Sequence, residues 1–351
     1  MAIGIGIGLP FRRNITTTLA VPSGLSASFT VNTISGDLTW TDNTGGVAQY
    51  EIYSSYNGNS YVYLGTTTAG ATSYSDTTCK QNASVVYRIR AKKGGTYSKY
   101  ATTSVINTPL CWKTNQSTRT NVVINSLWIT AGKTVNIDWG DGTNANYTGN
   151  NTDITKTYSA SAVDVFNIKL SGDLDYIIRL NHMTQIKSYG SLTNWILPRL
   201  FTGTGYIVLS GCSFTGNISN IICNGNIRYF RLFGNLLEGG LPAIIESDEL
   251  LYYEIHGNKL STSNISAFRK SMLSFNIKNQ TVAFPTAEID KLLKALADWY
   301  QVNAPTVNCT FDLSGANMGI PTDGVSNVDI VRLTGYYTTA GKSATIVVRT
   351  S

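Results

Sequence analysis

The chain has 351 residues, a formal net charge of +6 and only 14% charged side chains, against roughly 25% in a typical soluble domain. Its 20 Tyr, 6 Trp and 32 Gly, together with many Thr, Asn and Ser, favour strands and turns and exclude an all-helical protein. The positive charge forms no basic stripe and no apolar run approaches roughly 18 residues, so we expect no nucleic-acid partner and no membrane span.

The five cysteines are an odd number and form no C-x-x-C pair, which argues against a zinc site and against a disulfide framework. The N-terminus also lacks the basic and apolar regions of an export leader. An exterior-like composition with reduced thiols indicates a protein that is assembled in a reducing cytoplasm and displayed outside a cell, as on a virus particle. We therefore expect no bound metal, and free buried thiols at Cys79, Cys111, Cys212, Cys223 and Cys309.

Residues 1–19 are expected to form an N-terminal anchor segment. Ile3, Ile5 and Ile7 alternate with glycine, so an extended chain presents them, followed by Leu9 and Phe11, on one face. Such a segment cannot form a core alone, but it can add as a strand to the edge of a partner's sheet. The alternative is a frayed chain end.

Residues 20–109 contain short strands separated by turns at regular spacing, the pattern of an antiparallel β-sandwich. Trp40 stands early in this region, Tyr50 begins an alternating run, and Tyr87 leads a Y-x-I-x-A strand. The region resembles a fibronectin type III domain over nearly all of its expected length. That resemblance implies a spacer or binding module and not a catalyst.

Residues 110–175 are expected to form a second, smaller sandwich. A Trp139-Gly-Asp-Gly142 turn precedes a Thr-Tyr158 strand, and these motifs resemble the PKD-type domain. Asp138 and Asp141 have two alternative roles, a calcium or acid–base carboxylate pair, or caps of a tight turn. We favour the turn caps.

The last region, residues 176–351, has the clearest periodicity. The pattern Ile227-x-x-Phe230-x-Leu232-x-x-Asn235-x-Leu237 recurs 23 residues later and again 22 residues after that. This spacing resembles that of leucine-rich repeats. The resemblance implies a solenoid whose stacked copies share one core, with each Asn side chain satisfying backbone groups at the bend after a short strand.

Weaker copies flank the three clear ones. In the preceding copy, Cys212 takes the position of the Asn, which makes it a ladder residue and not a nucleophile. A degenerate last copy is expected around Phe311 and Leu313. The fold class is therefore mainly β, with two sandwich domains followed by a leucine-rich-repeat solenoid that carries some α-helix.

A C-terminal cap is expected to cover the open end of the solenoid. A helix over 286–300 supplies it, with Thr286 as the N-cap and Glu288 near the positive end. Residues 336–348 are expected to close the fold as a β-hairpin. Five large side chains fall on one face of the helix: Ile289, Leu292, Leu293, Leu296 and Tyr300.

Motifs for catalysis are weak throughout the chain. The segments 130–134 and 339–343 end like a phosphate-binding loop, but neither has glycine at the required position or an expected helix after it. The only histidines are His182 and His256, and no nucleophile stands in a motif beside them. We expect no enzymatic activity, no catalytic residue and no cofactor; glycan degradation by paired carboxylates is the enzymatic alternative.

The repeats also predict a binding surface. Residues between and just after the buried apolar positions of each repeat strand face outward. An outward aromatic ring among charged and polar side chains is typical of a protein-binding or sugar-binding patch. The alternative is a solvated face or a contact with a neighbouring subunit. Six residues would line one concave sheet: Arg231, Phe233, Glu254, His256, Asn276 and Lys278.

The order of modules and the Ile-Gly-Ile-Gly-Ile-Gly-Leu-Pro-Phe start resemble virion surface proteins of bacteriophages that infect Bacteroidetes, such as tail-fibre or head-fibre components. The resemblance implies a structural virion protein, a homo-oligomer that binds other virion proteins through its N-terminus. It also implies contact with a host cell-surface protein or glycan through the distal end. The alternative is a secreted or cell-surface bacterial adhesin or glycan-binding protein, which would be extracellular.

Overall fold

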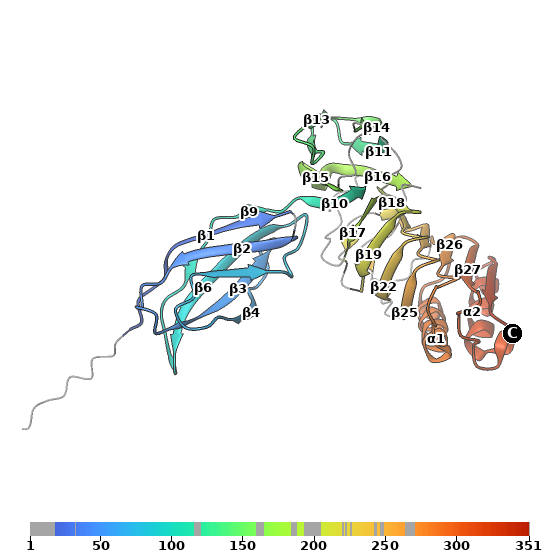
Figure 1. Ribbon diagram of the computed structural model, residues 1–351. Coiled ribbons are helices and arrows are strands. Elements are labelled where there is room, and N and C mark those ends of the chain that lie inside the picture. Colours follow the sequence, from blue (N-terminus) through green and yellow to red (C-terminus); the bar gives the residue numbers. More distant parts are fainter. Residues whose placement is uncertain are drawn as a thin grey trace, which may run out of the picture. The chain divides into compact units, whose positions relative to one another are not determined.

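The computed structural model describes residues 18–31, 33–115, 121–158, 165–183, 188–192, 205–219, 221, 223–224, 227–241, 244–245, 249–263 and 271–350. These residues are mainly in β-strands and divide into two compact units, which are labelled by element in Figure 1. No helix among them is both long and apolar enough to cross a membrane. The anchor predicted at Ile3, Ile5, Ile7, Leu9 and Phe11 lies outside the described residues and stays a prediction.

The first unit, which holds most of residues 18–106, is a two-sheet β-sandwich. One sheet has the order β1-β2-β5, and the other has the order β4-β3-β6-β7, with β8 and β9 also paired to β6. The strands are β1 (Ser23–Thr30), β2 (Ser35–Thr41), β3 (Gln49–Tyr56), β4 (Val62–Thr66), β5 (Ser73–Asp76), β6 (Ser84–Lys93), β7 (Thr96–Tyr97), β8 (Ala101–Thr102) and β9 (Ile106–Asn107).

Alternation along the strands builds the core of this sandwich. Trp40, Tyr50 and Tyr87 are all buried, and the rings of Trp40 and Tyr50 meet edge to face with centroids 5.1 Å apart. In β6 every second side chain points inward, which leaves the alternate side chains, among them Arg88 and Arg90, on the outer surface. A β-sandwich is therefore present in this part of the chain, as the sequence predicts.

The second unit begins at Asn107 and also includes two short earlier segments, Phe29–Ser35 and Thr77–Ser84. Its first part contains the strands β10 (Leu110–Asn115), β11 (Asn121–Ile129), β12 (Thr134–Asp138), β13 (Asn144–Thr148), β14 (Asn151–Thr157) and β15 (Val165–Gly172), followed by the 3-10 helix η1 (Leu174–Tyr176). These strands pair antiparallel in two sheets, as expected of a sandwich.

The remaining strands of the second unit pair parallel to one another. They are β16 (Ile177–Met183), β17 (Ser188–Ser191), β18 (Gly205–Ser210), β19 (Ser213–Asn217), β20 (Cys223–Asn224), β21 (Ile227–Arg231), β22 (Leu236–Gly240), β23 (Ile244–Ile245), β24 (Tyr252–Glu254), β25 (Lys259–Thr262), β26 (Ser274–Asn276), β27 (Cys309–Leu313) and β28 (Ala344–Val348).

No break separates the antiparallel part from the repeats. One sheet runs β13-β12-β15-β10-β17-β19-β22-β25, and the other runs β14-β11-β16-β18-β21-β24-β26-β27-β28. A single apolar core extends from Leu110 to Val348. The solenoid strands β16 and β17 cover the open edges of both antiparallel sheets.

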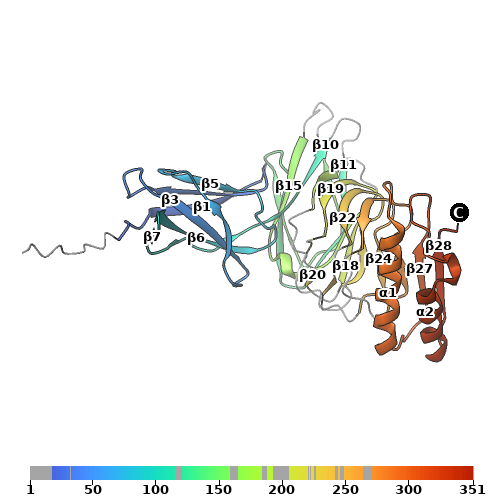
Figure 2. The ribbon, with the colours of Figure 1, turned by 90° about the horizontal axis from the view of Figure 1, so that it is seen from below.

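The repeats at 227–237 and 250–260 each contribute a strand to both long sheets, whereas β26, β27 and β28 extend only the nine-stranded sheet. The expected strand, such as β21, ends before the bend at Asn235, and a second strand, β22, follows that bend directly. A short parallel pair, β20 and β23, lies outside both sheets. Figure 2 shows the strands succeeding one another toward the helix α1 (Thr286–Val302). The solenoid is thus built from parallel strands on opposite sides of the core.

The predicted Asn ladder lines the bend between the two strands. The Asn258 amide donates to the carbonyl oxygens of Leu232 and Ile255, both at 3.0 Å, and its Oδ1 accepts the N–H of Leu237 at 3.1 Å. Asn235 and Gln280 repeat this arrangement one turn before and one turn after. At the preceding position the Cys212 thiol donates to backbone carbonyls, as a ladder residue does.

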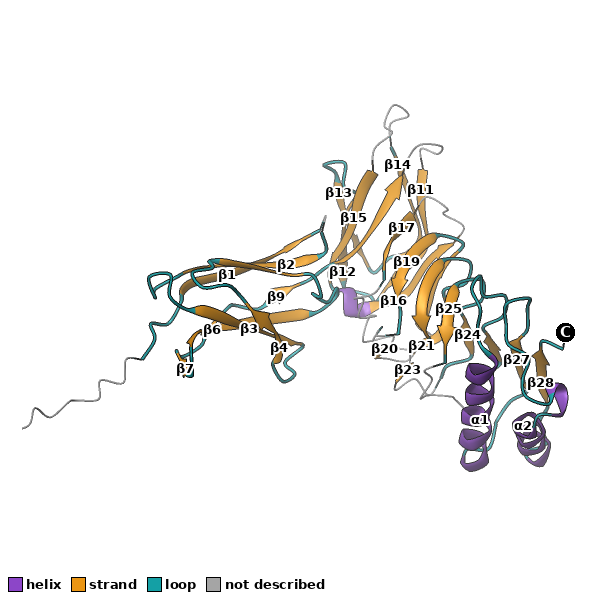
Figure 3. Cartoon of the chain, turned by 60° about the horizontal axis from the view of Figure 1, so that its bottom comes forward, coloured by secondary structure: helices purple, strands orange, loops and turns teal. Residues whose placement is uncertain are grey.

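Two helices lie beside the last strands, β27 and β28, and pack against each other (Figure 3). Helix α1 buries the predicted apolar face. Its N-cap is Pro285, so the N-cap predicted at Thr286 is wrong. The Glu288 carboxylate instead accepts hydrogen bonds from the backbone N–H and the hydroxyl of Ser263, both at 2.6 Å. The five buried side chains of that face are Ile289, Leu292, Leu293, Leu296 and Tyr300.

The β-hairpin predicted for residues 336–348 is wrong. After the 3-10 helix η2 (Gly324–Ser326), residues Val328–Thr339 form helix α2, and β28 then pairs parallel to β27. Ile330, Leu333 and Tyr337 are buried on one face of α2. The Tyr337 ring lies 5.0 Å from that of Tyr300 in α1, so packing against α1 overrides the local strand preference of the tyrosines.

Candidate binding surface

The predicted surface residues lie on the outer face of the nine-stranded sheet. In β21, Ile227 and Phe230 are buried, so Tyr229 and Arg231 point outward. The parallel register places Arg231 beside Glu254, Glu254 beside Asn276, and Asn276 beside Asp312. Phe233, His256 and Lys278 follow at the ends of the same strands, and all six predicted residues are half-buried.

These residues pair with each other across the strands. The Arg231 guanidinium lies 2.8 Å from the Glu254 carboxylate, and the Lys278 ammonium lies 2.9 Å from the Asp312 carboxylate. The Asn276 Oδ1 accepts the backbone N–H of Lys278 at 3.2 Å. The charges of this row therefore balance, and the side chains are held in fixed positions.

Phe233 and His256 form a stacked pair, with ring centroids 4.6 Å apart and planes within 6° of parallel. Burial lowers the pKa of His256 below its usual value of 6.5, while the carboxylates of Glu254 and Asp312 act in the opposite direction and Lys278 adds to the lowering. The imidazole is therefore held neutral as the partner of an aromatic ring.

A tyrosine ladder runs alongside, and the sequence analysis missed it. The rings of Tyr206 and Tyr229 stack at 4.2 Å, and those of Tyr229 and Tyr252 stack at 4.7 Å. Arg179 extends the row, since its guanidinium lies 3.9 Å from the Tyr206 ring and 4.4 Å from the Trp128 ring. The signal was present, because the three tyrosines recur every 23 residues.

Together these residues form what we call the ladder face. It presents tyrosine ring edges, a stacked aromatic pair and balanced ion pairs on adjacent strands, with no strongly charged centre. Such a surface can contact sugar hydroxyls or a protein surface with little loss of side-chain entropy. It consists of Tyr206, Tyr229, Arg231, Phe233, Tyr252, Glu254, His256, Asn276 and Lys278.

The other candidate groups have structural roles where the structure describes them. Asp138 accepts the N–H of Gly140 at 3.0 Å and Asp141 accepts the N–H of Thr143 at 3.0 Å, so both cap the turn as we favoured. Cys79, Cys111, Cys212 and Cys309 are buried and form no disulfide. Within the described ranges, no group of three or more His, Cys, Asp or Glu side chains could hold a metal ion.

No protein-family model matches the sequence, and no curated protein matches it. Among solved structures, the chain is similar to a two-domain fibronectin type III segment of chicken tenascin, with 16% identity, a TM-score of 0.25, and coverage of 43% of this chain and 91% of that one. It is similar to the chicken CNTN1 FN1–FN3 domains, with 14% identity, a TM-score of 0.23, and coverage of 43% and 62%.

A pectate lyase, PelI from Erwinia chrysanthemi in complex with tetragalacturonic acid, is also similar, with 9% identity, a TM-score of 0.20, and coverage of 75% of this chain and 84% of that one. The first two structures consist of fibronectin type III domains, the module that residues 20–109 resemble. TM-scores of this size establish no activity for the chain.

Proposed function

We propose that this chain is a structural protein of a bacteriophage particle, a tail-fibre or head-fibre component without enzymatic activity. Its N-terminal anchor binds other virion proteins, the chain forms a homo-oligomer, and the ladder face contacts a protein or glycan on the host cell surface. The chain is assembled in the host cytoplasm and resides on the virion.

The modules of this proposal follow the chain. Residues 20–109 are a fibronectin type III module, residues 110–175 are a PKD-like module, and residues 176–351 are a leucine-rich-repeat solenoid. The buried Trp139 of the W-G-D-G turn, whose carbonyl accepts the Tyr158 hydroxyl at 2.9 Å, supports the second module. The ladder of Asn235, Asn258 and Gln280 supports the third.

The ladder face is the observation that carries the proposal. Its side chains are fixed by their neighbours before any partner arrives, so binding costs little ordering entropy. Arg231 shows this best, because it is held by Glu254 and also lies 4.7 Å from the Tyr252 ring. A face that is merely solvated has no need of side chains held in this way.

Mass spectrometry of purified particles tests the location. We expect the chain at a constant copy ratio to the capsid protein, and we expect a variant lacking residues 2–11 to fold but to be absent from particles. Normal incorporation of that variant rejects the anchor. Recovery of the chain from bacterial envelopes and not from particles replaces the proposal with the adhesin alternative.

A double variant tests the ladder face. Arg231→Ala with Phe233→Ala should leave the melting temperature nearly unchanged and reduce adsorption of particles to host cells. Arg332→Ala is the control, since Arg332 is a half-buried arginine of α2 that also pairs with a carboxylate, that of Asp298, and it should leave adsorption unaltered. Unchanged adsorption of the double variant rejects the host contact, and loss of incorporation instead assigns the face to assembly.

A further inference from the structure

The β-sandwich carries a second polar and aromatic surface, distinct from the ladder face. It lies on the outward side of the sheet formed by β3, β4, β6 and β7, with residues from the adjoining loops. We call it the tyrosine–arginine face. It consists of Tyr53, Tyr61, Tyr63, Tyr97 and Tyr100 with Arg88, Arg90 and Lys92.

Arginine side chains lie over tyrosine rings throughout this face. The Arg88 guanidinium is 3.9 Å from the Tyr61 ring centroid and 4.2 Å from that of Tyr100, so two rings flank it. The Arg90 guanidinium is 4.0 Å from the Tyr97 ring. Stacking fixes the plane of each guanidinium group, and in Arg88 it leaves the outer N–H groups able to bind a carboxylate.

Charge is distributed unevenly between the two sheets of the sandwich. In the first unit, as far as it is described, three of the four carboxylates lie in or just after the strands β2 and β5: Asp37, Asp42 and Asp76. All five basic residues of that unit lie in β6 or in the β7–β8 connection: Arg88, Arg90, Lys92, Lys93 and Lys99. The tyrosine–arginine face therefore carries three basic side chains against one carboxylate, Glu51.

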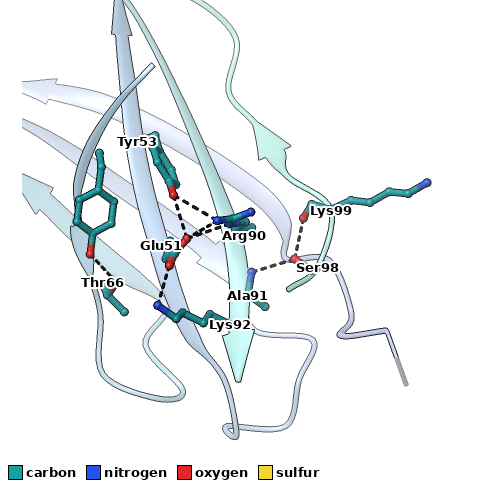
Figure 4. A network of polar contacts seen from close by, with 9 residues as sticks. Glu51, Tyr53, Thr66, Arg90, Ala91, Lys92, Ser98 and Lys99 are labelled. Carbon is teal, nitrogen blue, oxygen red and sulfur yellow. Dashed lines mark hydrogen bonds and ion pairs between the residues drawn. The ribbon is translucent and has the colours of Figure 1, made fainter. Parts of the chain in front are cut away.

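The one carboxylate on this face, that of Glu51, is buried and bound by side chains of the same face. It is 6% exposed and accepts hydrogen bonds from Arg90 Nη2 and Lys92 Nζ, both at 2.8 Å, and from the Tyr53 hydroxyl at 2.9 Å (Figure 4). Burial opposes its ionisation, but the bonds from Lys92 and Arg90 outweigh burial and lower the pKa of Glu51 to about 2.

Arg88 has no such partner. Among the described residues no carboxylate forms a salt bridge with it, and its buried Nε has no hydrogen-bond acceptor. A guanidinium that is positioned between two rings and left without an anion is a ready site for a carboxylate from outside the chain. On the same face, Tyr63 is 53% exposed and Tyr97 is 40% exposed.

We propose that the tyrosine–arginine face is a docking surface for an acidic protein segment, with a carboxylate of that segment bound by Arg88. Tyr and Arg are the residues that most often dominate protein–protein binding energy. A sugar ring needs a free aromatic face to stack on. Here one face of each of the Tyr61, Tyr97 and Tyr100 rings already carries a guanidinium group, and Tyr53 and Tyr63 meet edge to face at 5.4 Å.

The test measures binding of the full chain to poly-L-glutamate by isothermal titration calorimetry at low and at physiological salt. We expect saturable binding that weakens with salt, and a loss of about tenfold or more in affinity for Arg88→Gln. Lys259→Gln is the matched control, since it removes the same charge from an exposed position on β25 and should change affinity less than about twofold.

A second variant keeps the test decisive if Arg88→Gln fails to fold. Tyr63→Ala removes an exposed ring, so it should leave the melting temperature nearly unchanged while weakening poly-L-glutamate binding about threefold or more. Equal losses for Arg88→Gln and Lys259→Gln overturn the proposal, as does the absence of saturable binding. Tighter, Arg88-dependent binding of hyaluronate than of poly-L-glutamate also overturns it and makes the face a glycan site.

Discussion

Replacing Asn258 by alanine should destabilise the solenoid strongly, although the side chain lies at a bend and not in a strand. The buried amide of Asn258 makes its three shortest hydrogen bonds to backbone groups: the Leu232 and Ile255 carbonyls and the Leu237 N–H. Asn235 also donates to the Leu232 carbonyl, and Gln280 also donates to that of Ile255. In Asn258→Ala both carbonyls therefore keep one donor, and only the Leu237 N–H loses its sole acceptor.

The magnitude follows from this count. A buried N–H left without an acceptor costs roughly 1–3 kcal/mol, and each of the two lost donations contributes about 1 kcal/mol. We therefore expect Asn258→Ala to lower the free energy of unfolding by about 3 to 5 kcal/mol. Asn276→Ala, on the outer face of the next repeat, loses one hydrogen bond at a half-buried site and should cost about 1 kcal/mol or less.

Equilibrium urea unfolding of the full chain, followed by tryptophan fluorescence, measures both variants. The transition of the first unit should stay at the same urea concentration and serve as an internal reference. A cost for Asn258→Ala no greater than that for Asn276→Ala would show that the ladder does not hold the bends.

Asn258→Asp separates the donor role from the acceptor role. The aspartate keeps an acceptor for Leu237 but directs carboxylate oxygen at two carbonyls, so at pH 7 it should be at least as unstable as Asn258→Ala. Protonation restores a donor, so Asn258→Asp should become more stable than Asn258→Ala at low pH. A constant difference between the two variants across pH contradicts this assignment.

Three further perturbations test other sites. Because the pKa of His256 is below its usual 6.5, the free energy of unfolding of the wild-type protein should decrease as the pH falls below 6.5. Urea unfolding of His256→Gln should show a smaller decrease, and an equal decrease in both proteins excludes His256 as the cause. Because the pKa of Glu51 is about 2, its ion pairs should stabilise the sandwich by about 2 kcal/mol above pH 4.5, and this stabilisation should be lost as the pH falls toward 2. Glu51→Gln should not show this pH dependence, and equal acid unfolding profiles for the two proteins refute the prediction. Gly140→Ala places a Cβ 2.7 Å from the backbone of Asn167 at a φ of +77°, and it should lower the stability measured by thermal unfolding by at least about 2 kcal/mol. Gly142→Ala also has a positive φ, but its Cβ meets open space, so it should cost less. Equal costs would show that the close approach to Asn167 does not destabilise the variant.

The sequence by itself determined the repeating parts of this protein. Side-chain alternation and the 23-residue period are local properties, so they predicted the buried positions, the Asn ladder and the outward direction of Arg231 and His256. The tyrosine ladder follows the same period and was within reach of the same reasoning. The acidic turn caps at Asp138 and Asp141 were also predictable, because each binds backbone only two residues away.

Only the tertiary structure decided how these parts join. The solenoid continues the sheets of the antiparallel region because open sheet edges must be covered, and no local pattern states which strand covers them. Helix α2 replaces the expected hairpin because the Tyr337 ring packs against the Tyr300 ring of α1. The tyrosine–arginine face depends on Arg88 meeting rings that stand 27 residues before it and 12 after it in the chain, at Tyr61 and Tyr100. Contacts between residues this far apart in the chain depend on strand register and on the path of the loops, which are properties of the whole sheet.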